Sequence, residues 1–291
     1  MRYTICVTRL MKIPCKDIAL SLKKILQKNN APKLVTILVG SSPEQLSFVN
    51  IKRRIAREIG VEFELVHLRD TPPLSTFLEI VTQKARDPKT SGIIVQHPFP
   101  DSYSIEKIYT CIPPRKEIEG FHPESRFHFP LSLAVLSAIK WIINPDDSII
   151  SFQEDATILH AFLKDKNIVI AGRGVTGGAP IARALSKIGV QFSITNSTTE
   201  NTKNMYKSAD IIITATGKSI LDSSMIKQGV ILLNVGLRKE GGKLRGDYDE
   251  SEIDERAAYY TETPGGLGPL DVLYLFKNVI EAEEGKRGDR S

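Results

Sequence analysis

The feature that most limits the possible folds of this chain is the segment Asn167–Pro180, NIVIAGRGVTGGAP. It has the pattern of an apolar strand, a turn that contains Gly172, Gly174 and Gly177, and a following helix. Glycines in such a turn let the backbone approach a pyrophosphate, and the N–H groups at the start of the helix favour its negative charge. Because glycines at this spacing also occur by chance in loops, the surrounding sequence has to decide whether a nucleotide binds here.

The segments that follow alternate between strands and helices. Apolar runs separated by helical stretches and short turns predict four strands, at Asn167–Ala171, Gln191–Thr195, Asp210–Thr214 and Val230–Val235. This alternation is what a Rossmann-type half requires, so it predicts a nucleotide site at the glycine turn.

A second α/β unit is predicted before residue 120. Ser42, Pro43 and Gln45 form a capping-box pattern that starts a helix, and Gly60 is its expected end. The predicted order of elements is strand, helix, strand, helix, strand, at Leu34–Val39, Pro43–Glu58, Glu62–His67, Leu74–Arg86 and Gly92–Val95. Further helices are predicted at Leu131–Ile143, Gln153–Leu163 and Leu270–Ala282.

One lysine of the first predicted helix lies among apolar positions. Phe48, Lys52, Ala56 and Ile59 recur at helical spacing, which predicts that Lys52 is on the inward face. Gln96 stands at the end of the third strand, and ligands of parallel sheets bind at the carboxyl ends of the strands. These two residues are therefore candidates for a site.

Composition excludes several classes. The 291 residues suffice for two domains, and a net charge of +5, with basic residues spread among acids, suits an anionic small molecule at least as readily as nucleic acid. Without an RNA-binding aromatic signature or a helix-turn-helix pattern, no nucleic-acid partner is expected. Cys6, Cys15 and Cys111 are an odd number without metal-ligand spacing, so we expect no disulfide framework, no metal site and a cytoplasmic location. No signal peptide and no membrane-spanning run are expected.

The choice of nicotinamide cofactor depends on the end of the second Rossmann strand. No acidic residue stands there to bind a ribose 2′-hydroxyl, whereas Arg173 and a Ser/Thr/Asn cluster that includes Ser197 can hold a 2′-phosphate. This favours NADP, the alternative being that Arg173 is only an exposed turn residue. Four residues after the later strands are expected on the nicotinamide side: Thr216, Gly217, Gly236 and Leu237.

Four further stretches, in this order along the chain, resemble one family. They are SFVNIK at 47–52, GIIVQHPFP at 92–100, KEIEGFHP at 116–123 and PGGLGP at 264–269. Together with the glycine turn they resemble the bifunctional methylenetetrahydrofolate dehydrogenase/cyclohydrolase family, often called FolD. The resemblance implies an α/β protein of two domains: a three-layer catalytic domain (1–140 and 270–291) and a Rossmann-type NADP-binding domain (141–269). The C-terminal helix would return to the first domain.

The resemblance also implies an activity and a site. The activity is NADP-dependent oxidation of 5,10-methylenetetrahydrofolate, followed by hydrolysis of the methenyl product to 10-formyltetrahydrofolate, in a homodimer. Lys52 would move the proton, Gln96 would orient Lys52, and Glu119 would hold the pterin. Phe48, Gly265, Gly266 and Pro269 would contact the folate. The alternatives are an exposed ammonium for Lys52, a strand cap for Gln96 and a solvated loop acid for Glu119.

Four departures from the family pattern keep other functions open. The family usually has Tyr at Phe48, Leu at His97, and Asp at Glu119 and Asn234. His97 is expected to add a titratable group beside the site, although a structural histidine is the more common case. The alternatives are a dehydrogenase without cyclohydrolase activity and a folate- or nucleotide-binding module without catalysis; a shikimate-type dehydrogenase fits less well, because PGGLGP has no evident role there.

Overall fold

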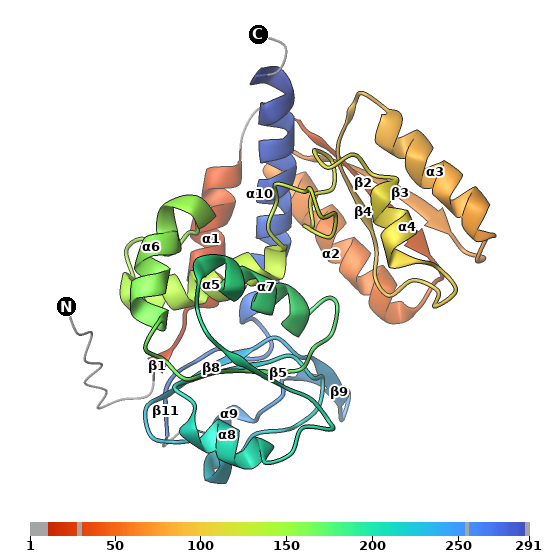
Figure 1. Ribbon diagram of the computed structural model, residues 1–291. Helices are drawn as coiled ribbons and strands as arrows, with labels where there is room; N and C mark the ends of the chain where they lie inside the picture. Colours follow the sequence, from red (N-terminus) through yellow and green to blue (C-terminus); the bar gives the residue numbers. More distant parts are fainter. Residues whose placement is uncertain (1–10, 28–30, 254–255, 289–291) are drawn as a thin grey trace. The chain divides into compact units, whose positions relative to one another are not determined.

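The computed structural model describes residues 11–27, 31–253 and 256–288, which leaves Cys6 outside the described part. The described chain divides into two compact units. Unit 1 contains the described residues up to Leu20 together with 131–271, and unit 2 contains the described residues of 21–130 and those from Val272 onward. The divisions fall inside helices α1 (Cys15–Leu26) and α10 (Leu267–Gly288) (Figure 1). The functional domain boundaries given above stay a prediction.

Unit 2 is built on a parallel sheet of three strands in the order β3-β2-β4. The strands β2 (Lys33–Val39), β3 (Glu62–Leu68) and β4 (Thr90–Val95) confirm the three predicted strands, each slightly longer than expected. β4 is buried along its whole length, as is typical of a parallel strand covered on both faces.

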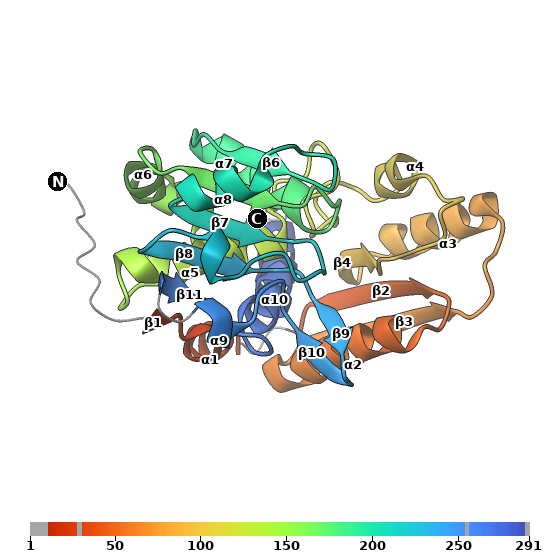
Figure 2. The ribbon, with the colours of Figure 1, turned by 90° about the horizontal axis from the view of Figure 1, so that it is seen from below.

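Helices cover both faces of this sheet. Figures 1 and 2 show α3 (Leu74–Arg86) and α4 (Ile105–Thr110) on one side, and α2 (Pro43–Ile59) and α10 on the other. A core of buried apolar side chains lies between the sheet and the helices of the first side. It includes Phe77 and Val81 of α3 and Val35 and Ile37 of β2. The predicted three-layer arrangement is confirmed, and so is the packing of the C-terminal helix on this unit, since Asn278 donates to the carbonyl oxygens of Ile118 and His128.

The capping box predicted for α2 is present. The Ser42 hydroxyl accepts from the N–H of Gln45, the Gln45 side chain accepts from the N–H of Ser42, and Pro43 begins the helix. Gly60 ends it with a φ of 78°, a left-handed conformation in which glycine has no Cβ to clash. These caps fix the direction in which α2 leaves β2.

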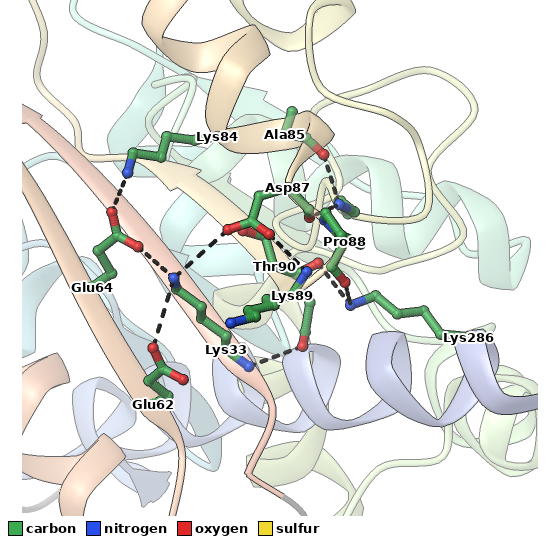
Figure 3. Close-up of polar contacts among 12 residues, drawn as sticks. Lys33, Glu62, Glu64, Lys84, Ala85, Asp87, Pro88, Lys89, Thr90 and Lys286 are labelled. Carbon is green, nitrogen blue, oxygen red and sulfur yellow. Dashed lines mark hydrogen bonds and ion pairs between the residues drawn. The ribbon is translucent and has the colours of Figure 1, made fainter.

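The amino ends of the three strands carry a cluster of charged side chains (Figure 3). The Lys33 ammonium lies 2.6 Å from a Glu64 carboxylate oxygen, and Lys84 forms an ion pair with the other oxygen of Glu64. Lys286 of α10 donates to the carbonyl oxygen of Thr90 at 2.7 Å. The contacts join β2, β3, α3 and α10 to the start of β4, so this edge of the sheet is occupied by structural ion pairs.

Unit 1 contains a six-stranded parallel sheet in the order β1-β11-β8-β7-β5-β6. The four predicted Rossmann strands are confirmed as β5 (Ile168–Ala171), β6 (Ser193–Thr195), β7 (Ile211–Thr214) and β8 (Val230–Asn234). Two strands that the sequence did not indicate, β1 (Met11–Lys12) and β11 (Ala257–Tyr260), extend the sheet beyond β8.

Helices again lie on both sides of the sheet. In Figure 1, α5 (Pro130–Ile143), α6 (Phe152–Leu163) and α7 (Gly178–Ile188) lie above it, and α8 (Thr202–Ser208) and α9 (Glu250–Ile253) below it. A short 3-10 turn, η1 (Ser223–Met225), precedes β8. An antiparallel hairpin, β9 (Arg238–Glu240) and β10 (Lys243–Arg245), extends from the end of β8 (Figure 2).

Some element boundaries differ from the predictions. α10 was expected at Leu270–Ala282 but spans Leu267–Gly288, because its first turn starts directly after Gly265 and Gly266 and Lys286 is held at its other end. α1 was not predicted. None of the described helices combines the length and the apolar composition needed to cross a membrane.

Candidate functional site

In unit 2 the predicted pair of Lys52 and Gln96 is in contact. The Lys52 ammonium donates to Gln96 Oε1 at 2.9 Å. Gln96 follows the last residue of β4; its N–H donates to the carbonyl of Ile37 on β2, and its Nε2 donates to the carbonyl of His97. Both ends of the Gln96 amide are thereby fixed, so its oxygen is held towards Lys52.

Lys52 lies on the inward side of α2, but the face differs from the predicted one. The buried residues of α2 are Gln45, Val49, Ala56 and Ile59, and Lys52 falls between Val49 and Ala56 in that series. Phe48, which was expected on the inward face, is 45% exposed. Phe48 therefore lies farther out than predicted: the buried positions centre on Gln45 and Ala56, and at about 100° of rotation per residue Phe48 falls at the edge of that face.

Gln45 is a residue of this edge that the sequence analysis missed as a site component. Its Nε2 donates to the carbonyl of Pro98 at 2.6 Å and to that of Val39 at 3.2 Å, so it ties the end of β2 to the turn after β4. The clue in the sequence was a glutamine on the face of α2 that is buried. Burial of a polar side chain costs little free energy only when its hydrogen bonds are formed, so such a residue is expected to have specific partners.

His97 is surrounded by aromatic side chains. Its ring centroid is 4.3 Å from that of Phe99 and 5.3 Å from that of Phe121, and Nε2 is 3.0 Å from the Tyr109 hydroxyl. Burial, and secondarily the charge of Lys52, lowers the pKa of His97 to about 4. The imidazole is therefore neutral beside the lysine at pH 7, which favours a structural role for His97 over that of a group that titrates there.

A buried carboxylate, that of Glu117, shapes the loop that carries Glu119. Glu117 is fully buried, and its oxygens accept from the N–H groups of Glu119 at 2.9 Å, Gly120 at 3.0 Å and His122 at 3.0 Å. Burial raises its pKa, and the backbone donors oppose that rise. The sequence analysis selected Glu119 and missed Glu117, which supports the loop from inside.

Glu119 lies close to the aromatic cluster. The pKa of Tyr109 is raised well above its usual value, chiefly by burial and then by the charges of Glu119 and Glu117. Unit 2 thus brings Lys52, Gln96 and His97 together in one set of contacts, and the charge of Glu119 acts on Tyr109, which contacts His97.

In unit 1 the glycine turn is packed at backbone distance against the next strand. A Cβ on Gly172, whose φ is 110°, would lie 2.4 Å from the carbonyl oxygen of Ala215. A Cβ on Gly178, the first residue of α7, would lie 1.9 Å from the carbonyl oxygen of Gly172. At Gly174 a Cβ would meet nothing within 4 Å, so this position is open. Gly178 was missed because Gly177 already completed the expected spacing.

The open side of the turn suits a dinucleotide phosphate. α7 starts at Gly178, so the N–H groups of its first turn lie beside Gly174 and Gly177, where a phosphate binds at a helix start. One of them, the N–H of Ala179, donates to the carbonyl of Gly174 at 3.1 Å. Arg173 is exposed. Beyond β6, Asn196 Oδ1 accepts from the N–H and hydroxyl of Thr198, and Ser197 is exposed in that loop.

The two loops predicted on the nicotinamide side contact each other. A Cβ on Gly217 would lie 3.2 Å from the carbonyl oxygen of Leu237, and one on Gly236 would lie 2.2 Å from a carboxylate oxygen of Asp247. The N–H and hydroxyl of Thr216 donate to Asp247 Oδ2 at 2.7 and 2.9 Å. Thr216, Gly217, Gly236 and Leu237 therefore share one surface, with Asp247 buried behind it.

The PGGLGP segment is also in unit 1. Gly265 has a φ of 102°, and its missing Cβ makes room for the side chain of Lys16, while a Cβ on Gly266 would lie 2.4 Å from the carbonyl oxygen of Glu262. Pro269 is in the first turn of α10. Local packing alone requires both glycines. The described residues contain no group of three or more His, Cys, Asp or Glu side chains that could hold a metal ion.

The chain matches known proteins along most of its length. The sequence model of "Tetrahydrofolate dehydrogenase/cyclohydrolase, catalytic domain" matches residues 10–119, and that of "Tetrahydrofolate dehydrogenase/cyclohydrolase, NAD(P)-binding domain" matches residues 149–287. The bifunctional protein FolD of Staphylococcus aureus is 32% identical over 264 residues, 90% of each chain. That of Staphylococcus saprophyticus is 32% identical over 259 residues, 88% of each chain.

Solved structures agree in fold. The bifunctional enzyme FolD from Campylobacter jejuni is 28% identical with a TM-score of 0.83, and the match covers 95% of this chain and 99% of that one. A 5,10-methylenetetrahydrofolate dehydrogenase from the silkworm, Bombyx mori, is 25% identical with a TM-score of 0.81, over 96% and 99% of the two chains. With both domain matches and relatives above 30% identity, the chain belongs to the tetrahydrofolate dehydrogenase/cyclohydrolase family.

Proposed function

We propose that this protein oxidises 5,10-methylenetetrahydrofolate with NADP as cofactor and hydrolyses the resulting 5,10-methenyl compound to 10-formyltetrahydrofolate. The observation that carries the proposal is the hydrogen bond from Lys52 to Gln96 at the carboxyl edge of unit 2, in a chain whose relatives are bifunctional FolD proteins. One-carbon metabolism is the setting that follows from these substrates.

In the hydrolysis, Lys52 is proposed to transfer the proton. Water that adds to the cationic methenyl carbon has to lose a proton, and opening of the ring requires one at the departing nitrogen, so one group near the carbon must take and return it. Lys52 is partly buried on α2 and held by Gln96, a neutral amide that orients it without adding charge. The neutral His97 nearby offers no competing cation.

Binding of the folate is assigned to Glu119, Phe48 and the PGGLGP segment. Glu119 is proposed to accept the pterin N–H groups, because a carboxylate can accept two neighbouring donors. Phe48 is exposed on α2 one turn before Lys52 and is proposed to stack on an aromatic ring of the substrate. Gly265, Gly266 and Pro269 are proposed to contact the folate.

The dinucleotide is assigned to the glycine turn of unit 1. The open space at Gly174 and the first turn of α7 fit its pyrophosphate, and Arg173 and Ser197 are proposed to hold the 2′-phosphate that distinguishes NADP from NAD. Gly172 and Gly177 shape the turn; Thr216, Gly217, Gly236 and Leu237 are proposed to line the nicotinamide, which accepts the hydride when the cofactor is bound. We accordingly propose residues 1–140 with 270–291 as the folate-binding domain and 141–269 as the NADP-binding domain.

A homodimer in the cytoplasm is the remaining part of the proposal. Among the described strands, β3 pairs only with β2, so its other edge offers backbone N–H and C=O groups that a second copy can pair with. Sedimentation equilibrium at micromolar concentration should give twice the mass of one chain; a single-chain mass at every concentration would contradict the dimer.

The activity is tested by following the absorbance of methenyltetrahydrofolate. Purified protein should form it from methylenetetrahydrofolate with NADP⁺ and then consume it faster than the spontaneous hydrolysis. Accumulation of the methenyl compound without such consumption would identify a monofunctional dehydrogenase, which Phe48 and Glu119 keep possible. Absence of turnover with either NADP⁺ or NAD⁺ would overturn the proposal.

A further inference from the structure

Asp247 is a buried carboxylate fixed from several sides at the end of the unit 1 sheet. It is fully buried; its Oδ2 accepts from the N–H and hydroxyl of Thr216, and its own N–H donates to Asn234 Oδ1 at 2.8 Å. Its carbonyl accepts from the N–H of Ile220 at 2.8 Å. The carboxylate therefore has one defined position relative to the ends of β7 and β8.

The groups around this carboxylate are uncharged. The carboxylate accepts from Thr216 and from backbone N–H groups, and the backbone N–H of Asp247 donates to Asn234. The ion pairs found among the described residues do not include Asp247. Burial raises its pKa, and the nearby backbone and hydroxyl donors of Thr216 counteract that. With no lysine, arginine or histidine partner in the described part of the chain, its charge acts on whatever lies next to it.

Asn234 completes the network with an amide. Its Nδ2 donates to the carbonyl of Gly236 and to Thr263 Oγ1, both at 2.9 Å, and its Oδ1 accepts from Thr214 Oγ1 at 2.9 Å and from the N–H of Asp247. All four hydrogen-bonding positions of the amide are used. The family usually has an aspartate here, so in this chain Asp247 carries the charge of the network alone.

The surface in front of Asp247 is the one assigned to the nicotinamide. Gly236 leaves no side chain between its backbone and the carboxylate, since a Cβ there would lie 2.2 Å from Oδ1 and 2.3 Å from Oδ2. Thr216, which Asp247 holds by two hydrogen bonds, belongs to the other loop of that surface. A nicotinamide ring bound on these loops would lie close to the Asp247 carboxylate, which forms no ion pair with a described residue.

We propose that Asp247 is a positioning residue that also sets the preference between the two redox states of the cofactor, favouring the oxidised one. The oxidised nicotinamide ring carries a positive charge and the reduced ring is neutral, whereas the rest of the dinucleotide is the same in both. A fixed negative charge behind the ring thus stabilises bound NADP⁺ relative to bound NADPH. This inference rests on the proposed function and deepens it.

The test is the ratio of the dissociation constants of NADPH and NADP⁺, measured by calorimetry at pH 8 on the full chain. Asp247→Asn should lower this ratio by about fivefold or more, because it removes a unit charge in a medium of low dielectric constant. Asn234→Asp adds a carboxylate to the same network and should raise the ratio. Asp222→Asn, which removes an exposed carboxylate at the start of η1, should leave it unchanged.

Thr216→Val separates a purely structural role, because it keeps the charge of Asp247 and removes the hydrogen bonds of the Thr216 hydroxyl with Asp247 and Lys218. It should weaken both forms by the same factor and leave the ratio as in the wild type. An unchanged ratio in both the Asp247→Asn and Asn234→Asp variants, with NADP⁺ and NADPH still bound, would overturn the inference and leave the proposed function standing. A wild-type protein that binds neither form would overturn the proposed function, and the inference with it.

Discussion

Replacement of Gly178 by alanine tests the geometry of the glycine turn most sharply. The added Cβ would lie 1.9 Å from the carbonyl oxygen of Gly172 and 2.8 Å from its carbonyl carbon. Both are backbone atoms, and ordinary contact begins near 3.4 Å, so the Gly172 peptide must move by roughly 1.5 Å. It cannot move towards β7, because Gly172 already approaches the carbonyl of Ala215.

Overpacking of this kind typically costs about 1–3 kcal/mol, and we expect a value near the upper end because two backbone segments have to shift. At roughly 2–4 °C per kcal/mol for a chain of this size class, thermal unfolding should shift down by about 6–12 °C. NADP affinity, measured by calorimetry, should fall by at least about tenfold, because the displaced peptide belongs to the phosphate-binding turn.

Gly174→Ala is the matched control for that variant. Its Cβ meets nothing within 4 Å, so the thermal transition should stay within about 2 °C of the wild type. NADP binding should nevertheless weaken, because the space in front of Gly174 is the space assigned to the pyrophosphate. A Gly178→Ala variant with unchanged melting temperature and affinity would refute the packing argument, and a Gly174→Ala variant with wild-type affinity would refute the placement of the cofactor.

Two further predictions concern unit 2. The pKa of His97 is about 4 in the folded protein and roughly 6.5 in the unfolded chain, so between these pH values the unfolded chain binds more protons and stability rises with pH. Acidification from pH 6.5 to 4 should therefore lower the free energy of unfolding by at most about 3 kcal/mol. His97→Leu should remove this part of the pH dependence, as measured by urea unfolding at pH 4.5 and 7. Equal pH dependence in both proteins would contradict the buried, neutral imidazole. Glu117→Gln replaces one acceptor oxygen by a donor that faces backbone N–H groups. It should lower the free energy of unfolding by about 2–3 kcal/mol and raise the KM for the folate. Glu124→Gln, on the exposed part of the same loop, should change neither quantity. Equal stability of the two variants would show that Glu117 does not hold the loop.

The elements that the sequence predicted well are those with strong local signals. The two ends of α2 are determined by nearby residues, the capping box of Ser42 and Gln45 at its start and the left-handed Gly60 at its end. Apolar runs such as Ile211–Thr214 indicate buried parallel strands. α1 and the β9–β10 hairpin were missed because α1 lacks a clear cap pattern and the hairpin strands have only three residues each. Short elements of this kind are determined by their neighbours in space.

The candidate site divides in the same way. Lys52 and Gln96 could be selected from the sequence because each occupies an unusual place for its type, one on a helix face and one at a strand end. Gln45, Glu117 and Asp247 could not, since the reason for each is a partner distant in the chain or a set of backbone N–H groups that only the folded loop presents. Phe48 was placed too far inward because the prediction used only the spacing of apolar residues. That spacing does not show that the buried face includes Gln45, whose amide forms its hydrogen bonds there.

The central claim is that Lys52 transfers the proton in the hydrolysis and has no part in cofactor binding. The direct test is the methenyltetrahydrofolate absorbance assay on the wild type and on Lys52→Met, with NADP affinity measured in parallel. The account predicts that the variant loses consumption of methenyltetrahydrofolate by at least about a hundredfold and binds NADP as the wild type does. A variant that hydrolyses the methenyl compound at the wild-type rate would contradict it.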